Sequence, residues 1–276
     1  MDLITADIRC LVQFSRFRGF VFDVDGVLKV GSRPIGGAPE VLEFLRERGR
    51  KVVLLTNIAT KSRAQQARHL RGIGIRVSVD EIFTSAYAAA RHLRERYGRV
   101  TCLAVGEVGL ADELRGAGHR VLSGTRGERA RFVVVGLDRG FNYGKLAVAQ
   151  HAILNGARFI ATNTDAWYPT ERGTMPGAGA MVAAVAAAAK CEPELVVGKP
   201  NVALLKLAME HMGVRKKDVV VIGDSIDTDM EMARRAGVAG ALVLTGNATM
   251  AAVRRLPKKE RPVMVLRSVS DIVERW

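Results

Sequence analysis

Short apolar runs alternate with longer amphipathic stretches from residue 20 to the end of the chain. The runs 52–55 and 219–222 are hydrophobic at every position, which is typical of strands buried on both faces of a parallel sheet. We predict strands over 20–24, 51–56, 100–105, 132–136, 159–162, 195–197, 219–223, 241–244 and 263–266. Helical patterns fill the intervals, for example 38–47, 61–70, 85–97, 143–154, 202–212 and 228–236. This alternation predicts an α/β protein with a doubly wound parallel sheet.

The middle of the chain has its own series of strands and helices, between two groups of predicted strands that end in polar residues. No internal repeat is evident, and no linker rich in proline or serine separates independent domains. We therefore predict a core domain formed by residues 1–82 and 186–276, with a second α/β domain inserted over residues 83–185.

Two aspartates one residue apart, Asp23 and Asp25, end the first predicted strand and precede Gly26. Alternate side chains of a strand share a face, so both carboxylates are expected to point the same way. At an effective dielectric constant near 20, two such carboxylates repel by about 4 kcal/mol. A divalent cation or a shared proton would relieve this repulsion. A strand that runs into an Asp-Gly turn explains the same residues without any chemistry.

Polar residues also end two later strands. Thr56 and Asn57 offer a hydroxyl and an amide that can hydrogen-bond a phosphate oxygen, although this pair also suits a turn or a helix cap. Lys199 lies between a glycine and a proline just before a predicted helix, whereas a lone lysine in a loop is usually solvated.

Three carboxylates, Asp224, Asp227 and Asp229, follow the apolar run 219–222 within six residues. Acidic residues in the first turn of a helix interact favourably with its dipole, which accounts for Asp227 and Asp229 but hardly for all three. The polar residues at the strand ends are expected to meet at the carboxyl edge of the sheet, where open α/β sheets bind their ligands.

In the order Asp-x-Asp, Thr, Lys, Gly-Asp-x-x-x-x-Asp, these pieces resemble the four motifs of the haloacid dehalogenase superfamily of phosphohydrolases. Segments 135–146, 159–165 and 176–180 resemble the NagD-like branch, which comprises p-nitrophenylphosphatases, phosphoglycolate phosphatases and pyridoxal phosphatases. The resemblance extends from about residue 20 to the end of the chain. It implies a Rossmann-like haloacid dehalogenase core and an inserted α/β cap domain that determines substrate specificity.

The resemblance also implies a role for each motif residue. Asp23 would attack phosphorus and form an aspartyl-phosphate, and Asp25 would protonate the leaving oxygen and then activate water, a division that fits covalent catalysis. Thr56 and Lys199 would bind the phosphoryl oxygens, with Asn57 beside them.

A magnesium ion is part of the same resemblance. Mg²⁺ would be held by Asp23, the backbone carbonyl of Asp25, Asp224 and water, and Asp229 would hold those waters. The chain departs from the family at Ile58, where members commonly carry a second asparagine, so a backbone N–H would serve there.

Two further positions, Lys29 and Val30, are individual to this chain and are expected to affect contacts with the leaving group. In the inserted domain, Asp165 and Trp167 are our candidates for substrate binding, because a carboxylate lies close to two aromatic residues near a predicted strand end. The alternative is that Trp167 and Tyr168 only cover the core of the inserted domain.

The 276-residue chain carries a formal net charge of +14, but its arginines are interspersed with glutamates on predicted helices. Solvated helix faces, ion-pair networks of a thermophile or an unusual genome composition explain this better than nucleic-acid binding, which we do not expect. A positive surface would also attract anionic substrates.

Three scattered cysteines, Cys10, Cys102 and Cys191, predict neither disulfides nor a zinc site and favour a reducing cytoplasm. The longest apolar run, 178–189, is too short to span a membrane, and acidic residues near the start argue against a signal peptide.

These observations predict a cytoplasmic, Mg²⁺-dependent phosphatase that hydrolyses small phosphomonoesters, with p-nitrophenyl phosphate as an artificial substrate. One alternative is a phosphotransferase or mutase that uses the same site. Another is a non-catalytic module of this fold that binds nucleic acid or protein. A homodimer formed through the cap is expected from related proteins. The core motifs handle only the phosphoryl group, so the choice among phosphoglycolate, pyridoxal phosphate, sugar phosphates and nucleotides is expected to lie in residues of the cap.

Overall fold

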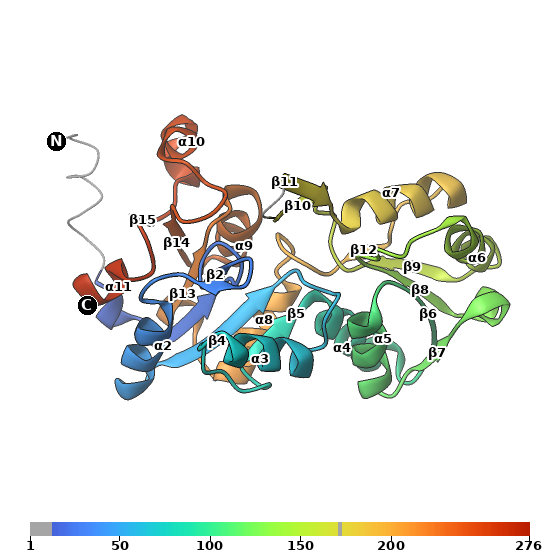
Figure 1. The fold of residues 1–276 in the computed structure, drawn as a ribbon, viewed down its shortest axis with the longest axis horizontal. Helices are drawn as coiled ribbons and strands as arrows, with labels where there is room; N and C mark the ends of the chain where they lie inside the picture. The colour runs from blue at the N-terminus through green and yellow to red at the C-terminus, as the bar shows by residue number, and fades with distance from the viewer. Residues whose placement is uncertain (1–12, 171–172) are drawn as a thin grey trace. The chain divides into compact units, whose positions relative to one another are not determined.

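The computed structural model describes residues 13–170 and 173–276, and it divides into two compact units (Figure 1). The core unit contains the described residues up to Thr56, together with His69–Ile82 and Leu205–Trp276. The insert unit contains Asn57–Arg68 and Phe83–Leu204. The domain predicted over residues 83–185 lies within the insert unit.

A six-stranded sheet in the order β15-β14-β13-β1-β4-β5 forms the centre of the core unit. Its strands are β1 (Gly19–Phe22), β4 (Lys51–Thr56), β5 (Ile82–Thr84), β13 (Val219–Gly223), β14 (Ala239–Val243) and β15 (Met264–Leu266). The pairings from β15 through to β4 are all parallel. The four residues of β1 and the five of β13 are buried at every position, which confirms the predicted two-sided covering.

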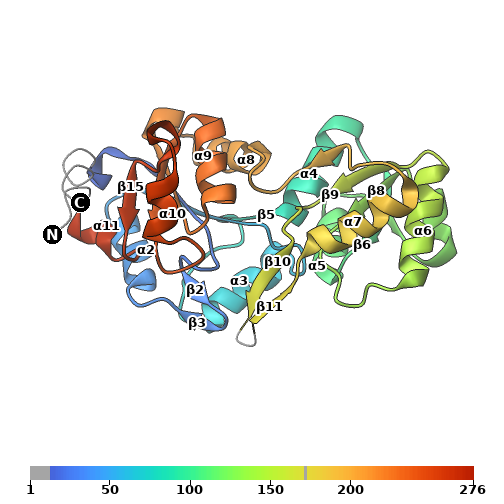
Figure 2. The ribbon, with the colours of Figure 1, turned by 90° about the horizontal axis from the view of Figure 1, so that it is seen from above.

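Helices cover both faces of this sheet. They are α2 (Ala38–Glu47), α3 (Arg63–Gly72), α8 (Ala203–Met212), α9 (Glu231–Ala236), α10 (Met250–Arg255) and α11 (Asp271–Glu274). The crossover from β1 through α2 to β4 leads towards the β5 edge of the sheet. The crossover from β13 through α9 to β14 leads towards the β15 edge. Because parallel crossovers are right-handed, α2 and α9 lie on opposite faces (Figure 2). The prediction of a doubly wound sheet is confirmed.

Aromatic side chains fill the core on one side of β1. The rings of Phe14, Phe17, Phe22 and Trp276 all lie between 6.3 and 6.5 Å from the ring of Phe20, centroid to centroid. Phe20 is fully buried, and Phe14 belongs to the 3₁₀ turn Phe14–Arg16 that precedes the sheet. This cluster joins the first described residues to the last residue of the chain.

The insert unit has a second parallel sheet in the order β12-β9-β8-β6-β7. Its strands are β6 (Thr101–Val105), β7 (Arg120–Leu122), β8 (Phe132–Val135), β9 (Arg158–Ala161) and β12 (Leu195–Val196). Its helices are α4 (Ser85–Tyr97), α5 (Val108–Gly116), α6 (Tyr143–Leu154) and α7 (Ala178–Ala189). Helix α6 packs against α7, and α4 packs against α5 (Figure 1).

Several elements were not predicted. Two are antiparallel hairpins, β2 (Lys29–Val30) with β3 (Arg33–Pro34) and β10 (Trp167–Thr170) with β11 (Gly173–Pro176). Figure 2 shows the second hairpin as a ribbon separate from the parallel sheets. Both hairpins are short and contain proline, so their sequences lack a strand pattern. Helix α7 is rich in alanine and apolar on all sides, so it shows no helical period.

The structure also bears on the predictions about cysteines, arginines and membrane-spanning helices. Cys102 and Cys191 are free thiols, whereas Cys10 lies outside the described residues. Arginines do pair with neighbouring glutamates on helices, as Arg234 and Arg235 do with Glu231 at 2.7 and 2.6 Å. Among the described residues, none of the helices combines the length and the apolar character needed to cross a membrane.

The aromatic cluster makes Phe20 a test of the core. Phe20→Ala is expected to lower the free energy of unfolding by about 3–5 kcal/mol, because it leaves a cavity among four rings. Denaturant unfolding followed by circular dichroism measures the change. The matched control is Tyr143→Ala, which removes an aromatic ring that is 85% exposed and should cost less than about 0.5 kcal/mol. Equal losses in the two variants would contradict the assignment of Phe20 to the core.

Candidate active site

Three buried carboxylates meet at the carboxyl edge of the core sheet. One oxygen each of Asp23, Asp224 and Asp229 lies within 4.8 Å of the others. The three residues are 9%, 3% and 1% exposed, respectively. Asp23 directly follows β1 and Asp224 directly follows β13, and these neighbouring strands are in register with Phe22 opposite Ile222. The cluster therefore lies where the strand order reverses, the usual ligand position in a doubly wound sheet.

The cluster suits a divalent cation. At 4.8 Å and an effective dielectric constant near 20, each pair of ionised carboxylates repels by roughly 3–4 kcal/mol. Oxygen ligands of this kind are those that Mg²⁺ prefers. The arrangement therefore has the donor set and the need for positive charge that define a metal site. Asp227, the third carboxylate of the same segment, is exposed and is not part of the cluster.

Asp224 is held by a loop that sequence reasoning missed. The backbone N–H and the side-chain amide of Asn247 both donate to Oδ2 of Asp224, at 2.8 and 2.9 Å. The backbone N–H of Ala248 donates to the Asp224 carbonyl at 3.0 Å. These contacts orient one carboxylate oxygen of Asp224. The sequence contains a signal for this loop, because Thr245-Gly246-Asn247 places polar residues shortly after the apolar strand β14.

Gly26 allows the first motif to approach Asp224 closely. Its φ angle is +77°, and a Cβ atom at this position would lie 2.3 Å from Oδ2 of Asp224. The hydroxyl of Thr245 donates to the carbonyl of Gly26 at 2.6 Å. A larger residue would therefore separate the loop after β1 from the loops after β13 and β14.

Asp25 has a different environment from Asp23. Its side chain is 52% exposed and forms an ion pair with Lys29. Lys29 itself is buried, at 7% exposure, and its ammonium also donates to the carbonyl of Gly31 at 3.1 Å. The structure therefore brings together Asp23, Asp224 and Asp229, while the Asp25 carboxylate faces Lys29. Lys29 is thus a partner of a motif residue.

The second and third motifs lie on both units. Thr56 ends β4 in the core unit and is 3% exposed. In the insert unit, the backbone N–H of Lys199 donates to Oδ1 of Asn57 at 2.8 Å, and Nδ2 of Asn57 donates to Oδ2 of Asp165 at 3.0 Å. Trp167 begins β10 and is 53% exposed. The phosphate-binding and substrate-binding roles of these residues stay predictions.

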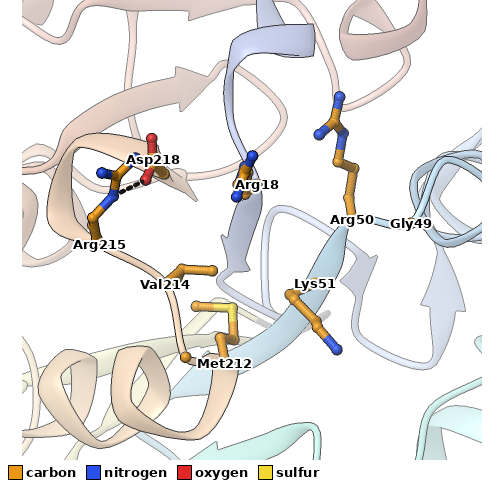
Figure 3. A pocket seen from close by; sticks show the side chains of 9 residues that line it. Arg18, Gly49, Arg50, Lys51, Met212, Val214, Arg215 and Asp218 are labelled. Atoms are coloured by element: carbon orange, nitrogen blue, oxygen red, sulfur yellow. Dashed lines mark hydrogen bonds and ion pairs between the residues drawn. The ribbon is translucent and has the colours of Figure 1, made fainter.

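A pocket of about 540 Å³ lies at the opposite, amino edge of the core sheet (Figure 3). Its lining includes Arg18, Arg50, Lys51, Arg215 and Asp218. Nε of Arg215 donates to Asp218 at 2.8 Å, and Arg50 donates to a backbone carbonyl at 2.9 Å. The hydrogen bond from Arg215, with the nearby charges of Arg215, Lys217 and Arg18, lowers the pKa of Asp218. Because two of its cations are already engaged, we assign no ligand to this pocket.

Known proteins resemble the chain over most of its length. A family model described as haloacid dehalogenase-like hydrolase matches residues 20–120, and one described as HAD-hydrolase-like matches residues 196–272. The chain is 36% identical to the sugar-phosphatase AraL of Bacillus subtilis over 256 residues, which cover 93% of this chain and 92% of that protein.

Solved structures show the same likeness. A 4-nitrophenylphosphatase from Thermotoga maritima has a TM-score of 0.88 and 30% identity, and the match covers 95% of this chain and 98% of that one. A glycerol phosphate phosphatase from Mycobacterium tuberculosis, in complex with magnesium, has a TM-score of 0.87 and 32% identity, with 95% and 78% covered. The chain belongs to the haloacid dehalogenase-like hydrolases, and the predicted resemblance to the NagD-like branch is confirmed.

The contact between Asn247 and Asp224 gives a test of the carboxylate cluster. Asn247→Ala is expected to weaken Mg²⁺ binding about tenfold or more, because outer partners orient the carboxylates that hold a metal. Calorimetric titration with Mg²⁺ measures the affinity. The matched control is Asn155→Ala, which truncates an exposed asparagine that follows α6. An unchanged affinity in Asn247→Ala would show that this loop does not support the metal site.

Proposed function

We propose that this haloacid dehalogenase-like hydrolase is a Mg²⁺-dependent phosphatase of small phosphomonoesters that works through an aspartyl-phosphate on Asp23. The cluster of Asp23, Asp224 and Asp229 carries the proposal, because it gives a buried nucleophile and a cation site at one point. Relatives named as a sugar phosphatase, a dihydroxyacetone phosphatase and a 4-nitrophenylphosphatase support phosphatase activity. A relative solved with magnesium supports the choice of ion.

Asp23, Asp224 and the backbone carbonyl of Asp25 would hold Mg²⁺, with Asp229 binding its waters. The ion, when bound, supplies the positive charge that lets an anionic phosphate approach a group of carboxylates. The protein contributes orientation. Asp224 is fixed by Asn247, and Asp23 continues the sheet hydrogen bonding, since its N–H donates to Ile222 at 2.8 Å.

The core residues then divide the reaction between them. The Asp23 carboxylate displaces the leaving group from phosphorus, and the hydroxyl of Thr56, from the end of the adjacent strand, binds a phosphoryl oxygen. Asp25 donates a proton to the leaving oxygen and later takes one from water. Its half-exposed side chain can exchange that proton with solvent between turnovers. The role of Lys199, binding the phosphoryl group and offsetting the charge of Asp23, rests on the motif alone.

The leaving group is the part of the substrate that the residues of the core unit do not select. The core residues handle only the phosphoryl group, so the choice among small phosphorylated metabolites belongs to the insert unit. We propose that Trp167 contacts the leaving group, because it is an exposed aromatic residue on a hairpin that joins no parallel sheet. A homodimer through the cap and a cytoplasmic location belong to the same proposal and rest on the sequence.

Hydrolysis of p-nitrophenyl phosphate tests the function. The purified protein is expected to release phosphate and p-nitrophenol in equal amounts with Mg²⁺, and EDTA should stop the reaction. Asp23→Asn should lower kcat by at least about 10³-fold, because an amide is a poor nucleophile. The control is Asp227→Asn in the same acidic segment, which should retain wild-type turnover. A folded protein without turnover would refute the proposal, and product release that required an added alcohol would identify a phosphotransferase instead.

Asp25 tests the covalent intermediate separately. Asp25→Asn should bind Mg²⁺ nearly as the wild type does but lose most turnover, because proton transfer fails in both steps. With p-nitrophenyl phosphate, whose leaving group needs little protonation, this variant should accumulate phosphoenzyme. Mass spectrometry after acid quenching should find one added phosphoryl group on the peptide that contains Asp23. Phosphorylation of a different residue would overturn the role of Asp23.

A further inference from the structure

The side chain of Asn57 binds both backbone groups of Lys199. Its Oδ1 accepts the N–H of Lys199 at 2.8 Å, and its Nδ2 donates to the carbonyl of Lys199 at 3.2 Å. The same Nδ2 donates to Oδ2 of Asp165 at 3.0 Å. All three residues belong to the insert unit, although 142 positions separate Asn57 from Lys199.

These contacts engage both the oxygen and the nitrogen of the Asn57 amide. A carboxamide has one oxygen that accepts and one nitrogen with two hydrogens to donate. Here the oxygen faces an N–H group, and the nitrogen faces a carbonyl and a carboxylate. The carboxylate of Asp165 can only accept when ionised, so a flipped amide would place two oxygens together. Asp165 therefore reinforces the amide orientation that the N–H and the carbonyl of Lys199 also favour.

The backbone of Asn57 is held as well. Its carbonyl accepts from the hydroxyl of Ser85 at 2.7 Å and from the side-chain amide of Asn163 at 2.9 Å. Ser85 begins α4, and Asn163 follows β9 in the insert sheet. The amide of Asn57 is therefore presented to Lys199 from a fixed main chain.

Gly198 allows the close approach of this loop. A Cβ atom there would lie 2.6 Å from Oδ1 of Asn57 and 2.5 Å from the carbonyl of Thr162. The N–H of Gly198 donates to that same carbonyl at 2.8 Å. Lys199 is only 4% exposed, and its ammonium lies at the end of a flexible four-carbon chain. The direction that this chain takes depends on how its backbone is fixed.

We propose that Asn57 is a positioning residue that sets the backbone of Lys199, with Asp165 as the partner that orients its amide. This proposal rests on the proposed function for the role of Lys199 in phosphoryl transfer. It differs from direct phosphate binding by the Asn57 amide, since both hydrogens of Nδ2 already face acceptors in the protein. It also gives Asp165 a role that does not require contact with the leaving group.

Amide hydrogen exchange tests the positioning without any substrate. In protein labelled with ¹⁵N-lysine, Asn57→Ala should speed exchange of the Lys199 amide by about fivefold or more, because its acceptor is lost. The chain offers a matched control, since Oδ1 of Asn142 accepts the N–H of Lys145 at 3.0 Å in the same unit. Asn142→Ala should speed exchange at Lys145 and leave Lys199 unchanged. An unchanged Lys199 amide in folded Asn57→Ala protein would overturn the proposal.

Kinetics test the consequence for catalysis. Asn57→Ala should lower kcat by on the order of 10²-fold, the effect of a misplaced catalytic group, whereas Asn142→Ala should keep wild-type kcat. In a Lys199→Met background, adding Asn57→Ala should cost less than about twofold, because the two residues act as one unit. If Asn57→Ala lowered kcat by the same factor in the Lys199→Met background as in the wild type, the proposal would be overturned. Absence of turnover in the wild type would refute the proposed function alone, because the exchange comparison would still decide this inference.

Asp165 provides a second variant that leaves Asn57 in place. Asp165→Ala should slow all substrates in a phosphate-release panel by a similar factor, because its effect passes through Lys199. Asp165→Asn should restore most of the rate, since the new amide oxygen can still accept from Nδ2 of Asn57. A changed ranking of substrates, with no rescue by asparagine, would assign Asp165 to the leaving group and overturn its role as an orienting partner.

Discussion

Mutual repulsion among three buried carboxylates is the constraint on which the core unit depends. Folding brings oxygens of Asp23, Asp224 and Asp229 within 4.8 Å of one another. Two adjacent parallel strands that end at the same edge place Asp23 and Asp224, and the helical turn Ile226–Met230 places Asp229. The cost is tolerated because local donors such as Asn247 fix Asp224, and because the arrangement can recruit a cation. A cluster whose carboxylates repel one another in the empty state would be stabilised by a bound cation, and this is the basis of the proposed magnesium site. Stability and function therefore act in opposite directions at this edge.

In the insert unit, the group whose position matters is the ammonium of Lys199, at the end of a flexible side chain. A lysine side chain loses considerable rotamer freedom when it is held in one conformation, and a fixed backbone reduces the number of conformations it can adopt. The structure fixes this backbone through one amide, Asn57, whose partners come from two distant segments of the chain. Charged groups used in phosphoryl transfer act mainly by position, so such an arrangement can affect the rate without contacting the substrate.

Most of the fold could be predicted from the sequence, because strands that are buried on both faces are apolar at every position. The strand over 219–223 and the helices over 38–47, 85–97 and 143–154 have the predicted bounds. Asp23 and Asp224 were also predictable at this edge, since each directly follows an apolar strand, whereas Asp229 lies in the helical turn Ile226–Met230 and its role was expected from the family resemblance. What could not be predicted depends on side-chain geometry. Nothing in the pair Thr56-Asn57 shows that the amide turns towards Lys199, and the exposed hairpin that contains Trp167 has no strand pattern.

The boundary between the two units passes through the second motif. Thr56 ends a strand of the core unit, and Asn57, the next residue, begins a segment of the insert unit. Every hydrogen-bond partner described here for Asn57 belongs to the insert unit, so the contact with Lys199 is a property of that unit alone. The carboxylates, in turn, are arranged by contacts within the core unit. The charged groups of each unit are therefore arranged by contacts within that unit, and neither arrangement includes a residue of the exposed hairpin β10–β11.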